Sequence, residues 1–590
     1  MTTSRRGLIK GAAFGGVLAG GGVLAGVGSL AGCAPKAAPD SGSVGAAAVT
    51  DAITTQTLAE AEKLFAIDYS DAERAMMIEG LETNLEVLNG LRAVDFDNAD
   101  APALVFDPKL PGRSVKSQKN SVMLNSAPPT AAPANDDDIA YASVAQQGAW
   151  LRAGVLSSAD LTAIYLKRID RFDGELSSFI TVTADLAREQ ASAADKDLAN
   201  GRDRGPLHGI PYGLKDLADV EGVTTSWGAA PYRERIGQAD SEIYRKLRRA
   251  GAVMLGKTSC GAIAYGDRWF GGTTKNPWNT REGSSGSSAG SAAAIAAGLC
   301  AFAIGTETLG SIISPSERCG ATGLRPTFGR ISRAGVMALC WSLDKAGPIC
   351  RTAEDTALVL GELNGFDADD AGAARVGFTY QGDADISSMT VGYVPEWFEK
   401  GDDVDRAALA ALRETGVSLK EFAWPAMDNR SLLQIVMVES AAAFSDLTLT
   451  NRDDEMVRQD VDAWPNTWRQ AWFMSAVDYV QIDRLRRRTM LALADAFAGY
   501  DALIGPNFAG DALLATNCTG HPQMIVRAGF TQTPSRTLTG AAASQIGSQT
   551  FRTPRGISLW ANIFEEGKII ALGRALEARL GVGAQRPPGF

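Results

Sequence analysis

Residues 283–327 hold serine, glycine and alanine at a density that constrains this chain more than any other segment. Ser287 and Ser288 begin a run of small residues that is typical of a closely packed helix. The apolar run Cys300–Gly305 then leads to a turn between glycines that ends at Ser311. A turn of this kind can direct several backbone N–H groups toward one point beside a serine hydroxyl. Spacing alone leaves open whether the turn is catalytic or an ordinary glycine–serine loop.

Short apolar runs separated by helical patterns extend along the chain from about residue 139. Ser157 begins an amphipathic helix that continues to Arg171, and a strand-like segment follows at 179–183. Further runs have the length and composition of buried strands, namely Ile210–Lys215, Val253–Lys257, Ala301–Ile304, Val391–Val394 and Ala502–Ile504. Buried strands that alternate with helices indicate an α/β fold with a mixed sheet.

The domain organisation follows from changes in composition. We expect one large domain over residues 139–590, because a chain of 590 residues exceeds what one simple core usually holds and therefore carries additions. Residues 51–106 are predicted to form a helical arm, and residues 107–138, rich in Pro, Ser, Asn and Asp, a linker. Residues 398–498 are predicted to be a helical insert in which tryptophans recur at helical spacing. Such aromatic side chains either form a core or line a pocket, and the sequence leaves both open.

Composition excludes several classes of function. The net charge of −11 and the lack of a basic stripe argue against nucleic-acid binding. Only two histidines, His208 and His521, occur in 590 residues, so a histidine-rich metal site is excluded. His208 lies in a Gly/Pro turn and is predicted to be structural. The cysteines after Cys33 show no paired spacing and are predicted to be buried thiols.

The first 33 residues are predicted to be a targeting segment rather than part of the fold. Arg5 and Arg6 form a twin-arginine pattern, and a weakly apolar stretch follows and ends in Leu-Ala-Gly-Cys at Cys33. This order is similar to a bacterial lipoprotein signal, in which Cys33 carries the lipid and becomes the first mature residue. The alternatives are an uncleaved anchor or a chance LAGC. We therefore expect an exported protein held on the membrane by acyl chains, with residues 34–50 as a flexible tether.

Lys215 is the plausible general base of a chain that has so few histidines. A serine hydroxyl is a weak nucleophile and needs such a base. Lys215 follows an apolar run in GIPYGLKDL, where it is either a surface residue that extends outward or a buried amine. Burial disfavours the charged form and lowers the pKa of a lysine by up to ~3–5. A buried Lys215 could therefore accept a proton near neutral pH.

Five ordered segments resemble the amidase signature family of serine hydrolases. They are GPLHGIPYGLKDLADVEGVTTSWG at 205–228, AGAVMLGKTS at 250–259, NPWNTREGSSGSSAGSAAAIAAG at 276–298, GTETLGSI at 305–312 and CGATGLRPTFGRISRAGV at 319–336. The resemblance extends over residues 140–365 and resumes weakly near the end of the chain. It implies a single large domain in which helices surround a twisted mixed β-sheet.

The resemblance also implies the roles of particular residues. Ser311 would be the nucleophile, Ser287 a bridging serine that follows a cis peptide bond, and Lys215 the base. The backbone N–H groups of Thr308, Leu309, Gly310 and Ser311 would hold the oxyanion. The reaction would pass through an acyl-enzyme and would need no cofactor.

Three positions depart from the family's usual pattern. Glycine is usual where Leu309 stands, aspartate where Glu307 stands, and arginine where Ile313 stands. A leucine restricts the backbone more than glycine does, and Ile313 removes a charge for which Arg318 is a candidate substitute. The substrate pocket is predicted to use Trp341, Cys518, His521 and the helical insert, which favours a hydrophobic or aryl amide.

The sequence is therefore compatible with three functions. The first is an exported, lipid-anchored amide hydrolase. The second is one component of an amidotransferase, because the family also serves glutamine-dependent tRNA amidation. The third is a non-catalytic binding lipoprotein on the same fold, suggested by Leu309 and Ile313.

Overall fold

The computed structural model describes residues 52–590 except 132, 134 and 537–544. The predicted signal segment, Cys33 and the tether lie outside these residues. Among the described helices, none is long and apolar enough to cross a membrane.

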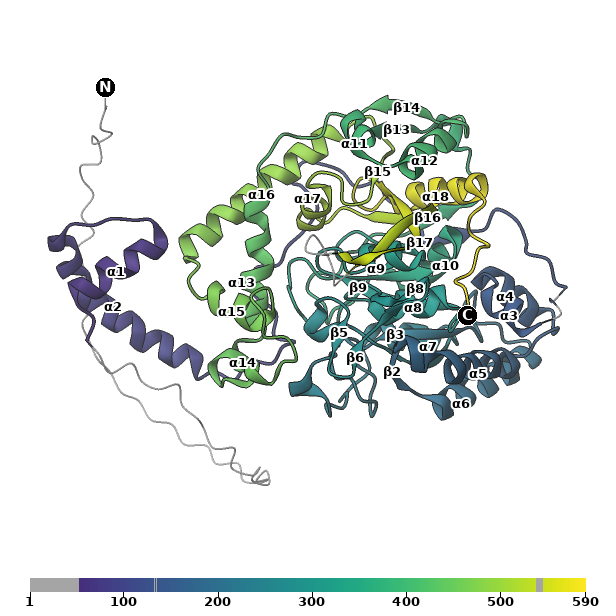
Figure 1. Ribbon diagram of the computed structural model, residues 1–590, viewed down its shortest axis with the longest axis horizontal. Helices are drawn as coiled ribbons and strands as arrows, with labels where there is room; N and C mark the ends of the chain where they lie inside the picture. Colours follow the sequence, from purple (N-terminus) through teal and green to yellow (C-terminus); the bar gives the residue numbers. More distant parts are fainter. Residues whose placement is uncertain (1–51, 132, 134, 537–544) are drawn as a thin grey trace, which may run out of the picture. The chain divides into compact units, whose positions relative to one another are not determined.

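A mixed sheet of eleven strands forms the centre of the described chain, in the order β14-β13-β15-β17-β16-β10-β11-β9-β3-β4-β2 (Figure 1). In sequence order its strands are β2 (Phe179–Val182), β3 (Pro211–Lys215), β4 (Val253–Thr258), β9 (Phe302–Glu307), β10 (Thr322–Arg325), β11 (Lys345–Cys350), β13 (Thr390–Tyr393), β14 (Ser418–Glu421), β15 (Ala502–Pro506), β16 (Gln523–Arg536) and β17 (Gln545–Trp560). β3 runs parallel to β4 and β9, whereas β11 is antiparallel to β9. The predicted α/β fold with a mixed sheet is confirmed.

Helices cover the sheet because its strands are apolar on both faces. Every residue of β3, β4 and β11 is buried, as expected for strands with helices on either side. The helices packed on the sheet include α5 (Ser158–Leu176), α6 (Ala184–Ala199), α8 (Ala289–Ala296), α9 (Ile313–Cys319), α10 (Ala353–Leu363) and α18 (Glu566–Leu580). α5 begins where the sequence predicted, with the Ser157 hydroxyl accepting a hydrogen bond from the Asp160 N–H.

The predicted helical insert at 398–498 begins too early and needs correction. α11 (Pro395–Lys400) and α12 (Asp403–Arg413) connect β13 to β14, and β14 is the edge strand of the main sheet, parallel to β13. Parallel neighbours need a crossover connection of this kind, so residues up to Glu421 belong to the sheet layer. The helices beyond the sheet are α13 (Leu433–Ala443), α14 (Ser445–Leu449), α15 (Trp464–Ala471) and α16 (Ala476–Ala496). Trp464 and Trp468 stack on one another at 5.7 Å between ring centroids, in a buried apolar cluster that also includes Leu217, Trp227 and Met337.

The predicted linker and arm contain more detail than the sequence indicated. The linker includes β1 (Ser121–Met123), which pairs with β12 (Thr379–Gln381), and it ends in α3 (Asp136–Tyr141). Local composition does not predict β1, because its pairing partner lies far away in the sequence. The arm forms α1 (Thr55–Phe65) and α2 (Asp71–Arg92), and the Ser70 hydroxyl caps α2.

Candidate active site

Lys215 ends β3 inside the protein, with 1% of its surface exposed. Its Nζ donates to Ser287 Oγ at 2.8 Å, to Ser288 Oγ at 3.0 Å and to Thr306 Oγ1 at 2.8 Å. Burial lowers the pKa of Lys215 to about 7, while the weaker effects of Cys260, Asp344 and Glu307 act in the opposite direction. Lys215 is therefore a buried amine with a substantial neutral fraction near pH 7, and it is not a surface lysine.

Ser287 and Ser288 lie immediately before α8, in a tightly packed segment. The Gly286–Ser287 peptide bond is cis, as the family resemblance implied. Gly286 has no room for a side chain, because a Cβ there would lie 1.9 Å from the carbonyl oxygen of Gly266. The Ser288 N–H donates to the carbonyl oxygen of Ser311 at 3.1 Å, which brings the two serine segments side by side.

The turn that carries Ser311 connects β9 to α9. Gly310 has a φ of +82°, a conformation that side-chain-bearing residues rarely adopt. Ser311 is 8% exposed and Thr308 6% exposed. The Thr308 hydroxyl donates to Asp344 Oδ1 at 2.6 Å, and Asp344 also accepts the N–H groups of Leu339 and Cys340. One carboxylate thus ties the turn to the loop that follows residue 338.

Glu307 holds the same turn from the other side. Its Oε2 accepts the N–H groups of Ile312 at 2.8 Å and Ile313 at 3.0 Å, and Arg325 Nη1 donates to Oε1 at 2.8 Å. Burial acts to raise the pKa of Glu307, but the Arg325 guanidinium outweighs it and holds that pKa below its usual value. Arg325, which sequence reasoning missed, therefore supplies the charge behind the turn.

Arg318 does not take the place of the arginine that is usual at position 313. The charged groups that act on it are Arg536, Glu282 and Asp267, which lie outside the turn. Ile313 itself is fully buried and faces the core. The compensation expected of Arg318 is thus provided by the buried Arg325–Glu307 pair instead.

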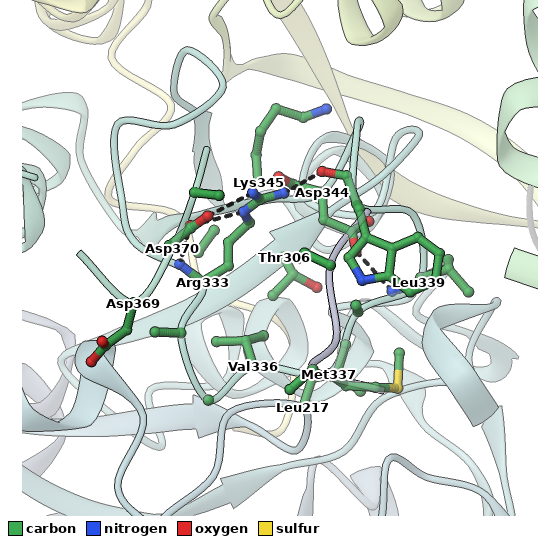
Figure 2. A pocket seen from close by; sticks show the side chains of 18 of the residues that line it. Leu217, Thr306, Arg333, Val336, Met337, Leu339, Asp344, Lys345, Asp369 and Asp370 are labelled. Atoms are coloured by element: carbon green, nitrogen blue, oxygen red, sulfur yellow. Dashed lines mark hydrogen bonds and ion pairs between the residues drawn. The ribbon is translucent and has the colours of Figure 1, made fainter. Parts of the chain in front are cut away.

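A cavity of about 340 Å³ lies beside Thr306 and Thr308. Its walls combine apolar side chains with charged ones, and Asp344 and Lys345 lie beside Thr306 (Figure 2). The apolar side chains include Leu217, Ala264, Val336, Met337, Leu339 and Trp341. Among the charged residues, Arg333 Nη2 donates to Asp370 Oδ1 at 2.8 Å. The cavity borders both the turn and a residue that contacts Lys215, so it is the candidate substrate site.

The predicted pocket residues do not share one cavity. Trp341 lines the cavity beside Thr308, as predicted. His521 lines a second cavity of about 270 Å³, stacks on Phe497 at 5.5 Å and exchanges a hydrogen bond with Thr519. Cys518 is fully buried in the apolar cluster that contains Trp464 and Trp468. Residues 518 and 521 lie at and just after the end of α17 (Ala512–Cys518). The helix ends between them, and their side chains have different surroundings.

Neither histidine is suited to act as the base. Burial lowers the pKa of His521 to about 3 and also lowers that of His208, so both rings are neutral at physiological pH. His208 Nδ1 accepts the N–H of Arg204 at 3.1 Å, which is the structural role that its turn predicts. Within the described ranges, no group of three or more His, Cys, Asp or Glu side chains could hold a metal ion. The six cysteines of those ranges are buried free thiols, as predicted.

Two further residues near Lys215 were not predicted from the sequence. Thr306 contacts the amine through its hydroxyl and its carbonyl oxygen, and Ser288 bonds both Lys215 and the Thr306 backbone. β3 and β9 are parallel neighbours in which Leu214 aligns with Ile304. Thr306 lies two residues farther along β9 and therefore lies close to Lys215 at the end of β3. For Ser288 the sequence offers a place among the neighbouring serines that compete for the bridging role, from which the following AGSAAA register selects Ser287.

Comparison with known proteins identifies relatives over most of this chain. A family model described as Amidase matches residues 160–570. The chain is 35% identical over 437 residues to a Glutamyl-tRNA(Gln) amidotransferase subunit of Chromohalobacter salexigens, covering 65% of this chain and 89% of that protein. It is 31% identical over 501 residues to the protein of the same name from Thioalkalivibrio sulfidiphilus, covering 76% and 99%.

Solved structures share the fold. The native peptide amidase from Stenotrophomonas maltophilia superimposes with a TM-score of 0.64 at 28% identity, covering 76% of this chain and 98% of that chain. A bacterial aryl acylamidase of the amidase signature family gives a TM-score of 0.63 at 21% identity, covering 76% and 99%. At that identity the second likeness concerns the fold alone.

Proposed function

This chain belongs to the amidase family and is an enzyme that acts on amide C–N bonds, and we propose that it hydrolyses a carboxylic amide through an acyl-enzyme on Ser311. The contact between Lys215 Nζ and Ser287 Oγ at 2.8 Å carries this proposal. It joins a buried amine of lowered pKa to a serine whose segment is hydrogen-bonded to that of Ser311.

The proton relay begins at the neutral amine of Lys215. Lys215 takes the proton of Ser287 as Ser287 takes the proton of Ser311, and the Ser311 oxygen attacks the amide carbonyl carbon. Backbone N–H groups of Thr308, Leu309, Gly310 and Ser311 stabilise the developing oxyanion. The relay then returns a proton to the leaving amine, and water attacks the acyl-enzyme and releases the acid.

The expected substrate is an amide with an aryl or alkyl group rather than a charged group near the reacting carbonyl. Support comes from the apolar side chains that line the cavity beside Thr306 and Thr308. Among the charged residues of the lining, Arg333 and Asp370 are paired with each other. Turnover of neutral aryl and alkyl amides by the purified protein from Ala52 onward, compared with charged analogues, measures this preference.

Mass spectrometry of the acylated serine tests the mechanism. Incubation with a fluorophosphonate or an activated amide should modify Ser311 in the wild-type protein. Lys215→Met should abolish this modification, and Ser311→Ala should remove its site. Modification of another serine, or an unchanged rate of labelling in Lys215→Met, would refute the proposed roles. Acylated Ser311 would also exclude a non-catalytic binding protein.

We further propose that the enzyme is exported and held on a membrane through a lipid on Cys33. The twin arginines, the apolar stretch and Leu-Ala-Gly-Cys support this in their order along the chain. Growth with an alkyne-bearing fatty acid should label the full chain, and Cys33→Ala should lose the label and release the protein from membranes. An unlabelled full chain that stays in the cytosol would overturn the proposal.

One component of an amidotransferase is the second candidate, and the sequence relatives favour it. The curated relatives at 31–35% identity are named as subunits of Glutamyl-tRNA(Gln) amidotransferase. Such a component would share the serine–serine–lysine chemistry but would deliver ammonia to a partner. Glutaminase activity that rises when partner proteins co-purify, with ammonia transferred to misacylated tRNA, would establish this candidate. Efficient hydrolysis of aryl or alkyl amides by the isolated chain would favour the first.

A further inference from the structure

The N-terminal segment after α2 contributes to the wall of the candidate substrate cavity. We call residues Asn98–Ala101 the cavity strap. Ala99 and Ala101 line the cavity together with Thr306 and Thr308. In Figure 2 a pale purple ribbon, the colour that Figure 1 gives to this part of the chain, runs through the pocket view beside Met337. The segment thus reaches the candidate site although it lies far before Lys215 in the chain.

Asn98 connects the strap to Ala338 through hydrogen bonds. Its Nδ2 donates to the carbonyl oxygen of Ala338 at 2.9 Å, and its Oδ1 accepts the N–H of Ala338 at 2.8 Å. A third, longer bond of 3.4 Å runs from Nδ2 to the carbonyl oxygen of Ala443 at the end of α13. Ala338 itself lines the cavity. The Asn98 amide therefore satisfies both backbone groups of a cavity residue and also reaches the helices beyond the sheet.

Contacts on either side hold the strap against the body. The Arg92 guanidinium lies 5.3 Å from the ring centroid of Trp472, and that of Arg486 lies 3.5 Å from the ring of Phe106. Phe106 also packs edge-on against Phe328 at 5.1 Å. Arg486 donates to the carbonyl oxygen of Ser342, next to the cavity residue Trp341. The chain before and after the strap is therefore held by residues outside the cavity lining, and Arg486 also bonds the residue next to Trp341.

We propose that the cavity strap sets the length of the substrate group that the enzyme accepts, and that Asn98 is the residue that positions it. This inference rests on the proposed amide hydrolysis at Ser311. Ala99 and Ala101 carry only methyl groups and are themselves exposed, so they form a narrow rim rather than a plug. An aryl or short alkyl group fits within about 340 Å³ of cavity, whereas a long acyl chain has to pass the rim that Asn98 holds in position.

Hydrolysis of p-nitroanilides with acetyl, butyryl, hexanoyl and decanoyl groups tests the proposal, alongside acetamides whose N-alkyl groups span the same lengths. Ala101→Trp narrows the rim and should lower kcat/KM for the longest members by roughly tenfold, with less than a twofold change for acetyl. Asn98→Ala should act in the opposite direction and raise kcat/KM for long substrates relative to short ones. Asn98→Asp keeps the acceptor for the Ala338 N–H and should fall between Asn98→Ala and the wild type.

A matched control separates a local effect from general loosening. Asn466→Ala removes a surface asparagine of α15 whose Nδ2 bonds the Val461 carbonyl oxygen at 2.8 Å, and it should leave length selectivity unchanged. Thermal unfolding of every variant identifies any that are merely misfolded. Unchanged selectivity in folded Ala101→Trp and folded Asn98→Ala, across both substrate series, would overturn the proposal.

Binding of the product acids distinguishes failure of this inference from failure of the proposed function. If the wild type hydrolyses no amide, hydrolysis at Ser311 is refuted but the strap remains measurable. Isothermal titration calorimetry with acetate, hexanoate and decanoate then reports binding to the cavity. Ala101→Trp should weaken decanoate binding and spare acetate. Equal binding of all three acids by the wild type, by Ala101→Trp and by Asn98→Ala would overturn the proposal independently of turnover.

Discussion

The protonation state of Lys215 is expected to govern the rate of this enzyme between pH 5 and 9. Burial lowers the pKa of this lysine from its usual 10.5 to about 7. At pH 7 about half of the amine is then neutral, compared with about 3 in 10,000 for an ordinary lysine. Only the neutral amine can accept the proton of Ser287. We therefore expect kcat/KM to rise about tenfold per pH unit below 7 and to level off above it.

The measurement is the pH dependence of kcat/KM with a substrate that does not titrate in this range. Lys345 provides a matched control, because burial, helped by the charge of Arg325, also lowers its pKa to about 7. Lys345→Met should alter at most the plateau and leave the midpoint in place. Disappearance of the midpoint in Lys345→Met would assign the titration to that residue. A wild-type profile that is flat across pH 5–9 would refute the lysine-base reasoning altogether.

Stability provides a second measure of the same pKa. Between pH 7 and 10.5 the unfolded chain binds more protons at position 215 than the folded chain does, so this position stabilises the fold increasingly as pH rises. The difference between the pKa values of Lys215 in the folded and unfolded chain corresponds to about 5 kcal/mol of unfolding free energy in full. About 2 kcal/mol of this is gained between pH 7 and 9. Relative to the wild type, Lys215→Met should therefore gain about 2 kcal/mol of unfolding free energy as the pH falls from 9 to 7. Urea denaturation at the two pH values measures this, and a difference independent of pH would contradict the lowered pKa.

Three further substitutions test how the site is built. Ser287→Ala removes the hydroxyl next to Lys215 Nζ and should slow phosphonylation of Ser311 by a fluorophosphonate probe by about 10²–10⁴. A rate within threefold of the wild type would exclude a relay. Arg325→Met leaves the Glu307 carboxylate buried without its cation and should cost about 3–5 kcal/mol in urea denaturation, whereas a loss below 1 kcal/mol would show that the pair does not hold the turn. Gly286→Ala inserts a Cβ 1.9 Å from a carbonyl oxygen and should lower the midpoint of thermal unfolding. Gly80→Ala is the control, because the added Cβ there meets nothing within 4 Å. Equal midpoints for the two variants would show that the segment accommodates the Cβ without loss of stability.

The strands were predictable from sequence because apolar runs between Gly/Pro turns fit a buried sheet. Residues 253–257 and 502–504 fall within β4 and β15 for this reason. β14 was not predicted, because its residues Ser418–Glu421 are mostly exposed at the sheet edge and lack an apolar run. It was therefore assigned to the helical insert.

The candidate site was predictable only as far as the family resemblance reached. The resemblance correctly paired Lys215 with Ser287, whose side chains are in contact. Contacts that depend on tertiary packing were beyond it, because Asn98 and Ala338 are 240 residues apart in the chain. Cys518 and His521 show that closeness in sequence does not ensure a shared pocket. They are three positions apart, but Cys518 is buried in an apolar cluster and His521 lines the second cavity.

The departures from the family's usual residues around Ser311 are explained together by the contacts of Glu307. A glutamate reaches one methylene farther than an aspartate, and this carboxylate accepts from two backbone N–H groups of the turn, from Arg325 and from Asn517. The buried cation it needs comes from β10, so position 313 is free to hold an apolar side chain that packs in the core. Leu309 then lies in a turn that is fixed at both ends, by Glu307 on one side and by the Thr308–Asp344 bond on the other. The restriction that leucine adds to the backbone therefore acts on a conformation that its neighbours already impose, which is why these departures are compatible with an active amidase.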